Sequence, residues 1–365
     1  MAKKTVLGID IGQDTLKLAL CRGGQVRKLA SAAMPKNLVK EGRIVSPESM
    51  GELLRKTMKE NRIHASLASL ALSNEASYVR TVTMPIMSAE QLELNIPYEF
   101  NDYITDELKN YVFDYAMIST PDDLRQARFG GIPGFGRGKK KEPPAQAPEA
   151  EAAGETEEEE EQSAPTMDVM VAAVRGEVLT EARETLRRAG LKLYRAAPSL
   201  CGFISLIRAH GGNGGYCILD LGFQSIRMYM FQGDRHVVTR VLETGLSVLD
   251  NVIADASNVD VHLAHTYLTT NYGDCQNQEY CINAYGNIAV ELIRALNFYN
   301  FSNPDSNLSD VWICGGGAAI APLRSAIAEN LDLQIHPAAE LIPGGTQSLE
   351  DGHNYLEAIG IAMDA

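Results

Sequence analysis

The chain has 365 residues, of which 45% are hydrophobic and 22% charged, and its formal net charge is −14. This length is enough for two sizeable hydrophobic cores, because a single core stops growing at roughly 250–300 residues. Nine glutamates lie between residues 142 and 165, and the rest of the chain has a net charge of only −5. It has no basic stripe, which excludes a nucleic-acid-binding protein.

The cysteines and the apolar runs indicate the compartment. Six cysteines are scattered along the chain, mostly inside apolar runs, which predicts free thiols in a reducing environment. No apolar run reaches the roughly 18 residues of a membrane span, and Asp10 interrupts the only apolar stretch near the N-terminus. We therefore expect a cytoplasmic protein without direct membrane insertion.

The first predicted element is a hairpin of two alternating strands, VLGIDIGQDTLKLAL at residues 6–20. Asp10 closes its first strand and Gly12 opens the turn. Such a turn presents backbone N–H groups that can hold a phosphate, while the carboxylate can hold a hydrated Mg²⁺. A single hairpin of this kind is weak evidence, since Asp and Gly are common turn residues.

A helix and two strands are predicted next. Ser88 and Gln91 have the spacing of a capping box, so a helix begins there, and it is kinked or broken near Pro97. Residues 111–119 and 167–175 alternate as two strands that neighbour each other in one sheet.

Between these strands, residues 120–166 are rich in Gly, Pro and Glu, a composition that buries too little apolar area to fold. We predict a disordered loop, acting either as a solvated spacer or as a docking site for a basic partner. An amphipathic helix follows at residues 176–190 and ends at Gly190.

The layout of the first hairpin is repeated at residues 216–231, YCILDLGFQSIRMYMF, where Asp220 closes a strand and Gly222 opens the turn. Two such hairpins predict an internal duplication that would hold a phosphate tail from both sides. A strand at residues 309–314 then runs into three glycines, and a helix follows after Pro322. This turn allows a ribose or a base to lie against the backbone.

Two other pairs do not support a site by spacing alone. His262 and His265 share a helix face, but no third ligand is near in sequence, so we do not assign a zinc site. Cys275 and Cys281 flank a polar loop, and we likewise do not assign a redox pair.

In this order and spacing, the two hairpins and the glycine turn resemble the actin-like ATPase superfamily. Four segments narrow the resemblance to the type IV pilus assembly protein PilM family: AAMPKNLVKEGRIVSPESMGELLRKTMKENRI, SYVRTVTMPIMSAEQLELNIPYEFNDYI, VMVAAVRGEVLTEARETLRRAGLKL and ELIRALNFYN. The similarity covers nearly the whole chain apart from residues 120–166.

The resemblance implies an α/β fold, namely the duplicated actin-like (RNase H-like) two-lobed fold with a small inserted subdomain, and ATP with Mg²⁺ as cofactors. The implied boundaries are residues 1–76 for the first lobe, 77–175 for the inserted subdomain with its disordered loop, 176–210 for the return to the first lobe and the lobe-linking helix, 211–350 for the second lobe, and 351–365 for a C-terminal helix returning to the first lobe.

Site residues are carried over from the same resemblance. They are Asp10, Gly12, Gln13, Asp14, Thr15 and Lys17 in the first phosphate hairpin, Asp220, Gly222, Phe223, Gln224 and Ser225 in the second, Gly315, Gly316, Gly317 and Ala318 in the adenosine loop, and Glu291 and Arg294 beside the base and ribose. Asp10 and Asp220 would hold Mg²⁺ through water. Glu291 and Arg294 have an alternative interpretation as a surface ion pair three residues apart.

The sequence departs from the family in ways that bear on catalysis. Gln13, Asp14, Phe223 and Gln224 stand where the family has small residues, and a carboxylate near phosphate is repulsive unless Mg²⁺ or Lys17 offsets it. Hydrolysis in the superfamily needs a Glu or Gln near the lobe-linking segment, but residues 191–216 contain no Asp, Glu or Gln, and Pro198 or Ser199 occupies that place. We therefore expect a weak ATPase or a pseudo-ATPase.

The function implied is that of a cytoplasmic scaffold in a type IV pilus, type II secretion or competence machine. It would bind the N-terminal tail of a PilN-like membrane protein in a groove bordered by Met84, Pro85 and Met87, be recruited by that partner to the inner face of the membrane, and contact the motor ATPase of the machine. Self-association is left open.

Two alternatives on the same fold are an FtsA-like cytoskeletal protein and a sugar-kinase-type phosphotransferase. The C-terminal sequence HNYLEAIGIAMDA is too short and acidic for the membrane-binding amphipathic helix of FtsA-like proteins. No catalytic Asp is evident in the lobe-linking segment for a kinase.

Overall fold

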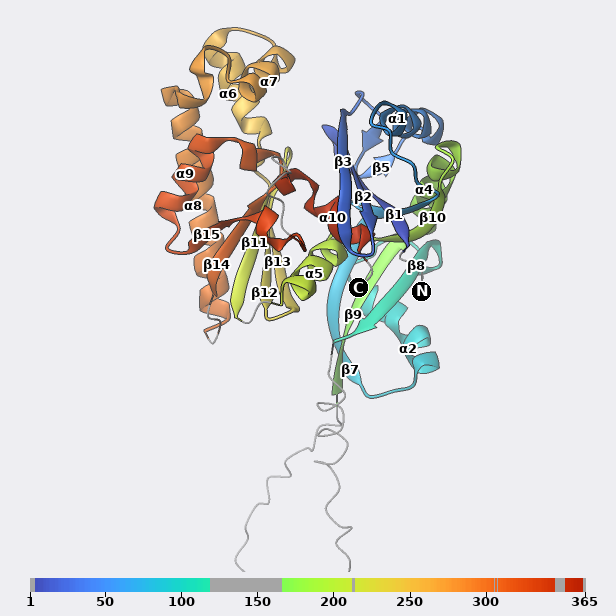
Figure 1. Cartoon of the computed structure of the whole chain (residues 1–365). Helices are drawn as coiled ribbons and strands as arrows, with labels where there is room; N and C mark the ends of the chain where they lie inside the picture. The colour runs from blue at the N-terminus through green and yellow to red at the C-terminus, as the bar shows by residue number, and fades with distance from the viewer. Residues whose placement is uncertain are drawn as a thin grey trace, which may run out of the picture. The chain divides into compact units, whose positions relative to one another are not determined.

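The computed structural model describes residues 4–118, 166–211, 214–304, 306, 308–344 and 352–363. The predicted disordered loop therefore lies outside the described residues, except for its last residue, Thr166. The chain divides into two compact units, Met1–Tyr78 with Val174–Ala365 and, inserted between them, Val79–Ala173 (Figure 1). All six cysteines are free thiols. In the described ranges, no helix is long and apolar enough to cross a membrane.

The first unit contains two five-stranded sheets of identical topology. In the first sheet the strands are β1 (Thr5–Ile11), β2 (Thr15–Arg22), β3 (Gln25–Ala33), β6 (Leu67–Leu72) and β10 (Lys192–Pro198). Their order is β10-β6-β1-β2-β3, with β1, β2 and β3 antiparallel and with β6 and β10 added in parallel.

In the second sheet the strands are β11 (Gly215–Leu221), β12 (Ile226–Gln232), β13 (Arg235–Leu242), β14 (Leu308–Cys314) and β15 (Gln334–Pro337). The order β13-β12-β11-β14-β15 repeats the pattern of an antiparallel meander with two parallel strands added. The repeat confirms the predicted duplicated α/β fold, and we call the elements packed on each sheet the first and the second lobe.

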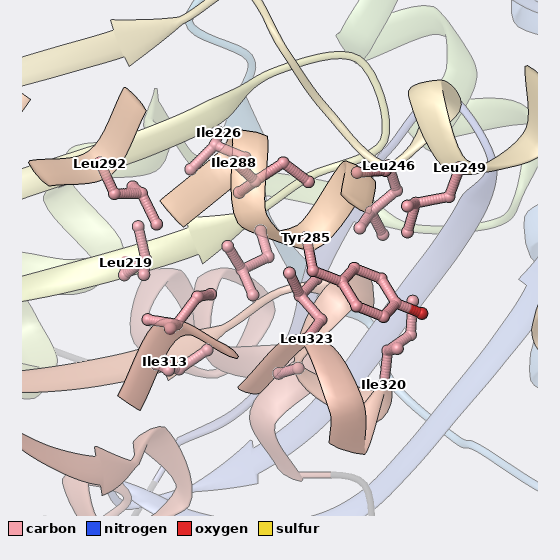
Figure 2. Close-up of a cluster of buried hydrophobic side chains, with 14 of the residues drawn as sticks. Leu219, Ile226, Leu246, Leu249, Tyr285, Ile288, Leu292, Ile313, Ile320 and Leu323 are labelled. Atoms are coloured by element: carbon pink, nitrogen blue, oxygen red, sulfur yellow. The ribbon is translucent and has the colours of Figure 1, made fainter. Parts of the chain in front are cut away.

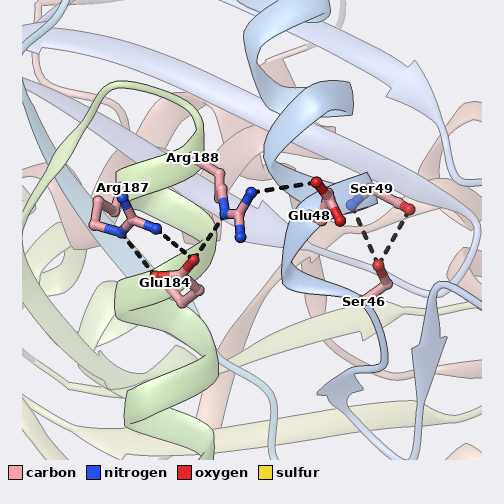
Figure 3. A network of polar contacts seen from close by, with 6 residues as sticks. All are labelled: Ser46, Glu48, Ser49, Glu184, Arg187 and Arg188. Carbon is pink, nitrogen blue, oxygen red and sulfur yellow. Dashed lines mark hydrogen bonds and ion pairs between the residues drawn. The ribbon is translucent and has the colours of Figure 1, made fainter.

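Helices α1 (Pro47–Glu60) and α4 (Gly176–Arg188) form the core of the first lobe with one face of its sheet, where Leu7 and Ile9 of β1 are fully buried. The predicted helix at 176–190 is confirmed as α4, followed by Gly190 with φ of 80°. On the outside, Arg188 of α4 contacts Glu48 of α1 at 3.2 Å within a polar network (Figure 3). These side chains are largely exposed, so the network contributes little to stability.

The second lobe is built by α6 (Ser247–Ser257), α7 (Val261–Thr270), α8 (Glu279–Ser302) and α9 (Ala321–Asn330). Leu219 of β11, Ile226 of β12 and Ile313 of β14 meet Leu292 and Tyr285 of α8 in its core (Figure 2). The strand residues that alternate with these lie on the opposite face; Tyr229, for example, packs against an aromatic ring of the lobe-linking helix described next.

Two helices link the lobes, α5 (Ser199–His210) and α10 (Leu356–Ala362). Phe203 of α5 lies 4.7 Å from Tyr229, centroid to centroid. A Cβ atom on Gly360 of α10 would lie 2.1 Å from the carbonyl oxygen of Gly202 in α5, and a Cβ on Gly8 of β1 would lie 1.7 Å from the backbone of α10. Only glycine allows the two helices and β1 to approach this closely.

The second unit has its own small core. It contains β7 (Ser77–Pro85), β8 (Tyr111–Met117) and β9 (Thr166–Arg175) in the order β7-β9-β8, with α2 (Ala89–Asn95) and the 3₁₀ turns η1 (Ile96–Phe100) and η2 (Leu108–Asn110). The Ser88–Gln91 capping box is confirmed, and the helix becomes a 3₁₀ turn at Pro97. The two strands predicted at 111–119 and 167–175 are β8 and β9, and they are neighbours.

Short elements complete the first unit: β4 (Val39–Lys40), β5 (Arg43–Ile44), η3 (Tyr272–Asn277), η4 (Gly316–Ala319), η5 (Ala338–Leu341) and η6 (Gly352–Tyr355).

Candidate functional site

A cavity of about 420 Å³ opens in the first unit, lined by both lobes. Its lining comes from the β1–β2 and β11–β12 hairpins, the turn after β14, helix α7 and the N-terminal ends of α5 and α10. We call it the central cavity. Its volume lies in the range typical of small-molecule sites.

The two hairpins that line the central cavity are built in the same way. A Cβ atom on Gly12 would lie 2.9 Å from the carbonyl oxygen of Thr15, and a Cβ on Gly222 would lie 2.6 Å from that of Ser225. Each turn therefore requires glycine, because the carbonyl three residues later folds back over it. In both hairpins the aspartate pairs across the ladder with a cation seven residues later, Asp10 with Lys17 and Asp220 with an arginine, Arg227.

The turn after β14 packs directly on the second hairpin. Gly315 has φ of 83°, and a Cβ at this position would lie 2.4 Å from Oδ1 of Asp220. Its N–H donates to the carbonyl oxygen of His353 at 3.3 Å. A side chain at 315 would strain the backbone and push into the carboxylate, so the glycine holds Asp220 at the edge of the cavity.

Charged groups from both lobes interact across the cavity. Lys17 Nζ lies 3.2 Å from Asp10 Oδ2. Burial opposes the charge on Lys17, but the carboxylates of Asp10, Glu357 and Asp220 outweigh burial and raise its pKa. Burial raises the pKa of Asp220, against the opposing effect of Lys17 and Arg227.

Glu357, in the first turn of α10, is a third acid of this group. Ser199 Oγ, at the N-terminal end of α5, donates to Glu357 Oε2 at 2.9 Å and also lies 3.2 Å from the carbonyl oxygen of Leu72. Desolvation, followed by the negative charges of Asp10 and Asp220, raises the pKa of Glu357 to about 8. The sequence had indicated no acid at the position of Ser199, but the carboxyl group of Glu357 lies beside this serine.

The unusual turn residues of the hairpins have partners. Gln13 Nε2 donates to both carboxylate oxygens of Glu75 at 3.3 Å. Asp14 accepts from Thr15 Oγ1 at 3.1 Å and lies 3.6 Å from His265 Nε2 of α7. Asp14 therefore faces the imidazole of His265, which offsets its charge only when protonated, whereas Lys17, one of the two offsets expected from the sequence beside Mg²⁺, pairs with Asp10.

His265 connects this contact to the core of the second lobe. Its Nδ1 lies 2.9 Å from Oδ2 of Asp250, a residue that is only 1% exposed. The hydrogen bond to Asp250 raises the pKa of His265 in spite of burial. Phe223 packs edge-on against the imidazole at 5.6 Å, so its ring lies against His265. His262, the second histidine on the same helix face, contacts Lys36. In the described part of the chain, no three His, Cys, Asp or Glu side chains lie close enough together to hold a metal ion.

Most of the predicted site residues line the central cavity: Asp10, Gly12, Gln13, Asp14, Thr15, Lys17, Asp220, Gly222, Phe223, Gln224, Ser225, Gly315 and Gly316. Gly317 and Ala318 do not line it; they are buried beneath the turn. Glu291 and Arg294 do not line it either, and form an exposed ion pair on α8. Met84, Pro85 and Met87 belong to the second unit, where Met84 is in the core, Pro85 is exposed and Met87 is half-buried.

Several residues of the lining were missed by sequence reasoning, among them Glu75, Arg227, His265, Gln276 and Glu357. Arg227 had a signal, because aligning the two hairpins places it where Lys17 stands in the first. The others lie in unrelated segments, and nothing in their local sequence indicates a cavity.

The lining fits a phosphate-bearing ligand only together with a cation. Five carboxylates (Asp10, Asp14, Glu75, Asp220 and Glu357) and two cationic side chains (Lys17 and Arg227) line the cavity. Carboxylate oxygens suit Mg²⁺, which usually keeps several of its waters and is shared with phosphate oxygens. Asp10 and Asp220 could hold such an ion through water.

Proteins of known structure share this architecture. The structure is similar to that of the PilM–PilN type IV pilus biogenesis complex, with a TM-score of 0.75, 23% identity, and coverage of 98% of this chain and 97% of that chain. It is also similar to the ethanolamine utilization protein EutJ from Carboxydothermus hydrogenoformans, with a TM-score of 0.56, 13% identity, and coverage of 100% and 90%. The fold is therefore actin-like. The sequence model of the family described as type IV pilus assembly protein PilM matches residues 8–126 and 156–365, and the chain belongs to this family.

Proposed function

We propose that this protein is a nucleotide-binding scaffold of a type IV pilus or a related secretion machine. In this proposal the central cavity binds Mg·ATP between the two lobes, and the second unit captures the N-terminal tail of a PilN-like membrane protein. That partner would recruit the chain to the inner face of the membrane, where it would also contact the motor ATPase.

The observation that carries nucleotide binding is the paired geometry of the two hairpins. Both turns have a glycine under a folded-back carbonyl, and both place an aspartate opposite a cation. Lys17 and Arg227 are the groups suited to the phosphate charges, and Gly315 and Gly316 offer a backbone surface to the nucleoside. The proposal does not require hydrolysis.

Nucleotide binding is tested by thermal unfolding with and without Mg·ATP. A ligand present at about 100 times its dissociation constant stabilises the folded state by roughly 3 kcal/mol, so the midpoint should rise by several degrees. Asp10→Ala is expected to remove this rise. The matched control is Asp234→Ala, an exposed aspartate that pairs with Arg208 away from the cavity. An equal rise in Asp10→Ala and wild type, or none in wild type, would refute the assignment.

Partner capture by the second unit is supported by family membership and by apolar surface on this unit. Leu94, Tyr98 and Tyr103 are exposed by 71%, 67% and 50%. Of the three residues that the resemblance placed beside the groove, Met87 is the most informative, because Met84 is needed for the core and Pro85 for the end of β7.

A synthetic peptide with the N-terminal sequence of the PilN-like protein from the same cell tests this step by calorimetry. Met87→Asp is expected to weaken binding by tenfold or more, by about 1.4 kcal/mol or more. Leu263→Asp, an exposed leucine of α7 in the first unit, is the matched control and should bind as wild type does. Equal binding by the two variants would remove Met87 from the proposed groove.

A further inference from the structure

We infer that Glu357 is the catalytic carboxylate of a slow ATP hydrolysis in the central cavity, with Ser199 as its positioning residue. This inference rests on the proposed nucleotide binding. It reverses the expectation, drawn from residues 191–216, that the chain lacks the acid needed to orient the attacking water.

Ser199 and Glu357 lie where the superfamily places its water-orienting residue. Ser199 opens α5, the lobe-linking helix at whose start the water-orienting residue is expected, and it lines the central cavity. Glu357 comes from the other lobe-linking helix, α10, and it lines the same cavity. The 2.9 Å hydrogen bond between them brings the carboxyl group to the place left by the missing acid.

The carboxyl group of Glu357 is held firmly by its neighbours. Ser199 is 3% exposed, and its hydroxyl engages Oε2 of Glu357 while also facing the carbonyl oxygen of Leu72. The backbone of α10 is held against α5 by the Gly202–Gly360 contact. A carboxylate on a helix that packs against a second helix is better oriented for catalysis than one on a loop.

The other four acids of the cavity are engaged by other groups. Asp10 is engaged by Lys17, and Glu75 by Gln13. Asp14 faces His265, and Asp220 packs under Gly315. Glu357 has a neutral hydroxyl as its hydrogen-bond donor, which leaves Oε1 as the oxygen suited to accept a proton from water.

The reaction balances with water as the only co-reactant. The ionised form of Glu357 accepts one proton as the water oxygen bonds to the γ-phosphorus, and the bond from that phosphorus to the bridging oxygen breaks. The bonding electron pair leaves with ADP, the water oxygen stays in inorganic phosphate, and the proton passes from Glu357 to solvent.

The test measures nucleotide binding and hydrolysis separately in the full chain. Wild type, Glu357→Gln and the exposed control Glu60→Gln are mixed in excess with labelled Mg·ATP, and single-turnover release of phosphate is followed. Glu357→Gln is expected to keep the thermal shift with Mg·ATP and to lose at least about 100-fold in rate, while Glu60→Gln matches wild type. The amide keeps the shape of the side chain but cannot take the proton.

A second readout does not depend on turnover. ADP with Mg²⁺ and aluminium fluoride, which mimics the transferring phosphoryl group, should raise the unfolding midpoint of wild type above that with Mg·ADP alone. Glu357→Gln should lose this extra rise. Ser199→Ala should lower the rate about tenfold, and Ser199→Thr, which keeps the hydroxyl, should restore it.

The outcomes separate the two proposals. No thermal shift with Mg·ATP in wild type refutes nucleotide binding itself. A normal shift with no hydrolysis in wild type, or with equal hydrolysis in wild type and Glu357→Gln, overturns the role of Glu357 and leaves the binding proposal intact.

Discussion

The replacement Glu357→Gln also makes a prediction about stability that needs no ligand. A carboxyl group has an ordinary pKa of 4.5 in the unfolded chain, and here burial raises the pKa of Glu357 to about 8. Between these values the folded protein keeps a proton that the unfolded chain has lost. The contribution of Glu357 to stability is therefore most favourable below about pH 4.5 and is lost as the pH rises through about 8, whereas glutamine does not titrate.

The size of the effect follows from the same shift. Each pH unit within this window changes the free energy of unfolding by about 1.4 kcal/mol, which gives about 3 kcal/mol between about pH 5.5 and about pH 7.5. Glu357 is only half-buried, and solvent screening reduces this figure, so we expect the stability advantage of Glu357→Gln over wild type to grow by about 1–3 kcal/mol over this interval.

The assay is urea unfolding of wild type, Glu357→Gln and Glu60→Gln at both pH values, without nucleotide or magnesium. Glu60 is exposed on α1, so its variant should follow wild type at every pH. If the difference in the free energy of unfolding between Glu357→Gln and wild type stays constant with pH, or shrinks as the pH rises, the surroundings do not keep the carboxyl group of Glu357 protonated.

Three further outcomes follow from the site. Gly315→Ala forces a Cβ atom to within 2.4 Å of Asp220 at a positive φ. It should lower the free energy of unfolding by about 1–3 kcal/mol and abolish the rise in the thermal midpoint with Mg·ATP. A variant as stable as wild type would contradict this packing. His265→Ala removes the partner of the buried Asp250 carboxylate, whose other oxygen already has no hydrogen-bond partner, and should lower the free energy of unfolding by about 3 kcal/mol. A decrease below about 1 kcal/mol would contradict this prediction. Chelating Mg²⁺ should remove the rise in the thermal midpoint with ATP, because carboxylates outnumber cationic side chains in the cavity. Glu291→Ala should leave this rise unchanged. A rise with ATP in the absence of Mg²⁺ would mean that Lys17 and Arg227 alone compensate the phosphate charge.

Local patterns in the sequence were sufficient to predict the repeated elements of this protein. Alternating strands that end in an aspartate and turn at a glycine depend on residues within about fifteen positions of one another, so both hairpins could be predicted before their packing was known. The Ser88–Gln91 capping box and the end of α4 at Gly190 are equally local, since each is a hydrogen bond or a backbone angle of a single helix end. Arg227 could have been added from the same repeat.

The chemistry of the cavity was decided by the tertiary structure. Glu357 lies 158 residues from Ser199 in sequence, and His265 lies 251 residues from Asp14; only the packing of α10 on α5 and the position of α7 bring these side chains together. The same distinction explains Glu291 and Arg294, whose spacing fits either a site or a surface pair, and which the orientation of α8 leaves in solvent. Periodicity and turn chemistry determine elements, because they act between neighbours in the chain. Which acids share a cavity depends on contacts between distant segments, and these carry no local signature.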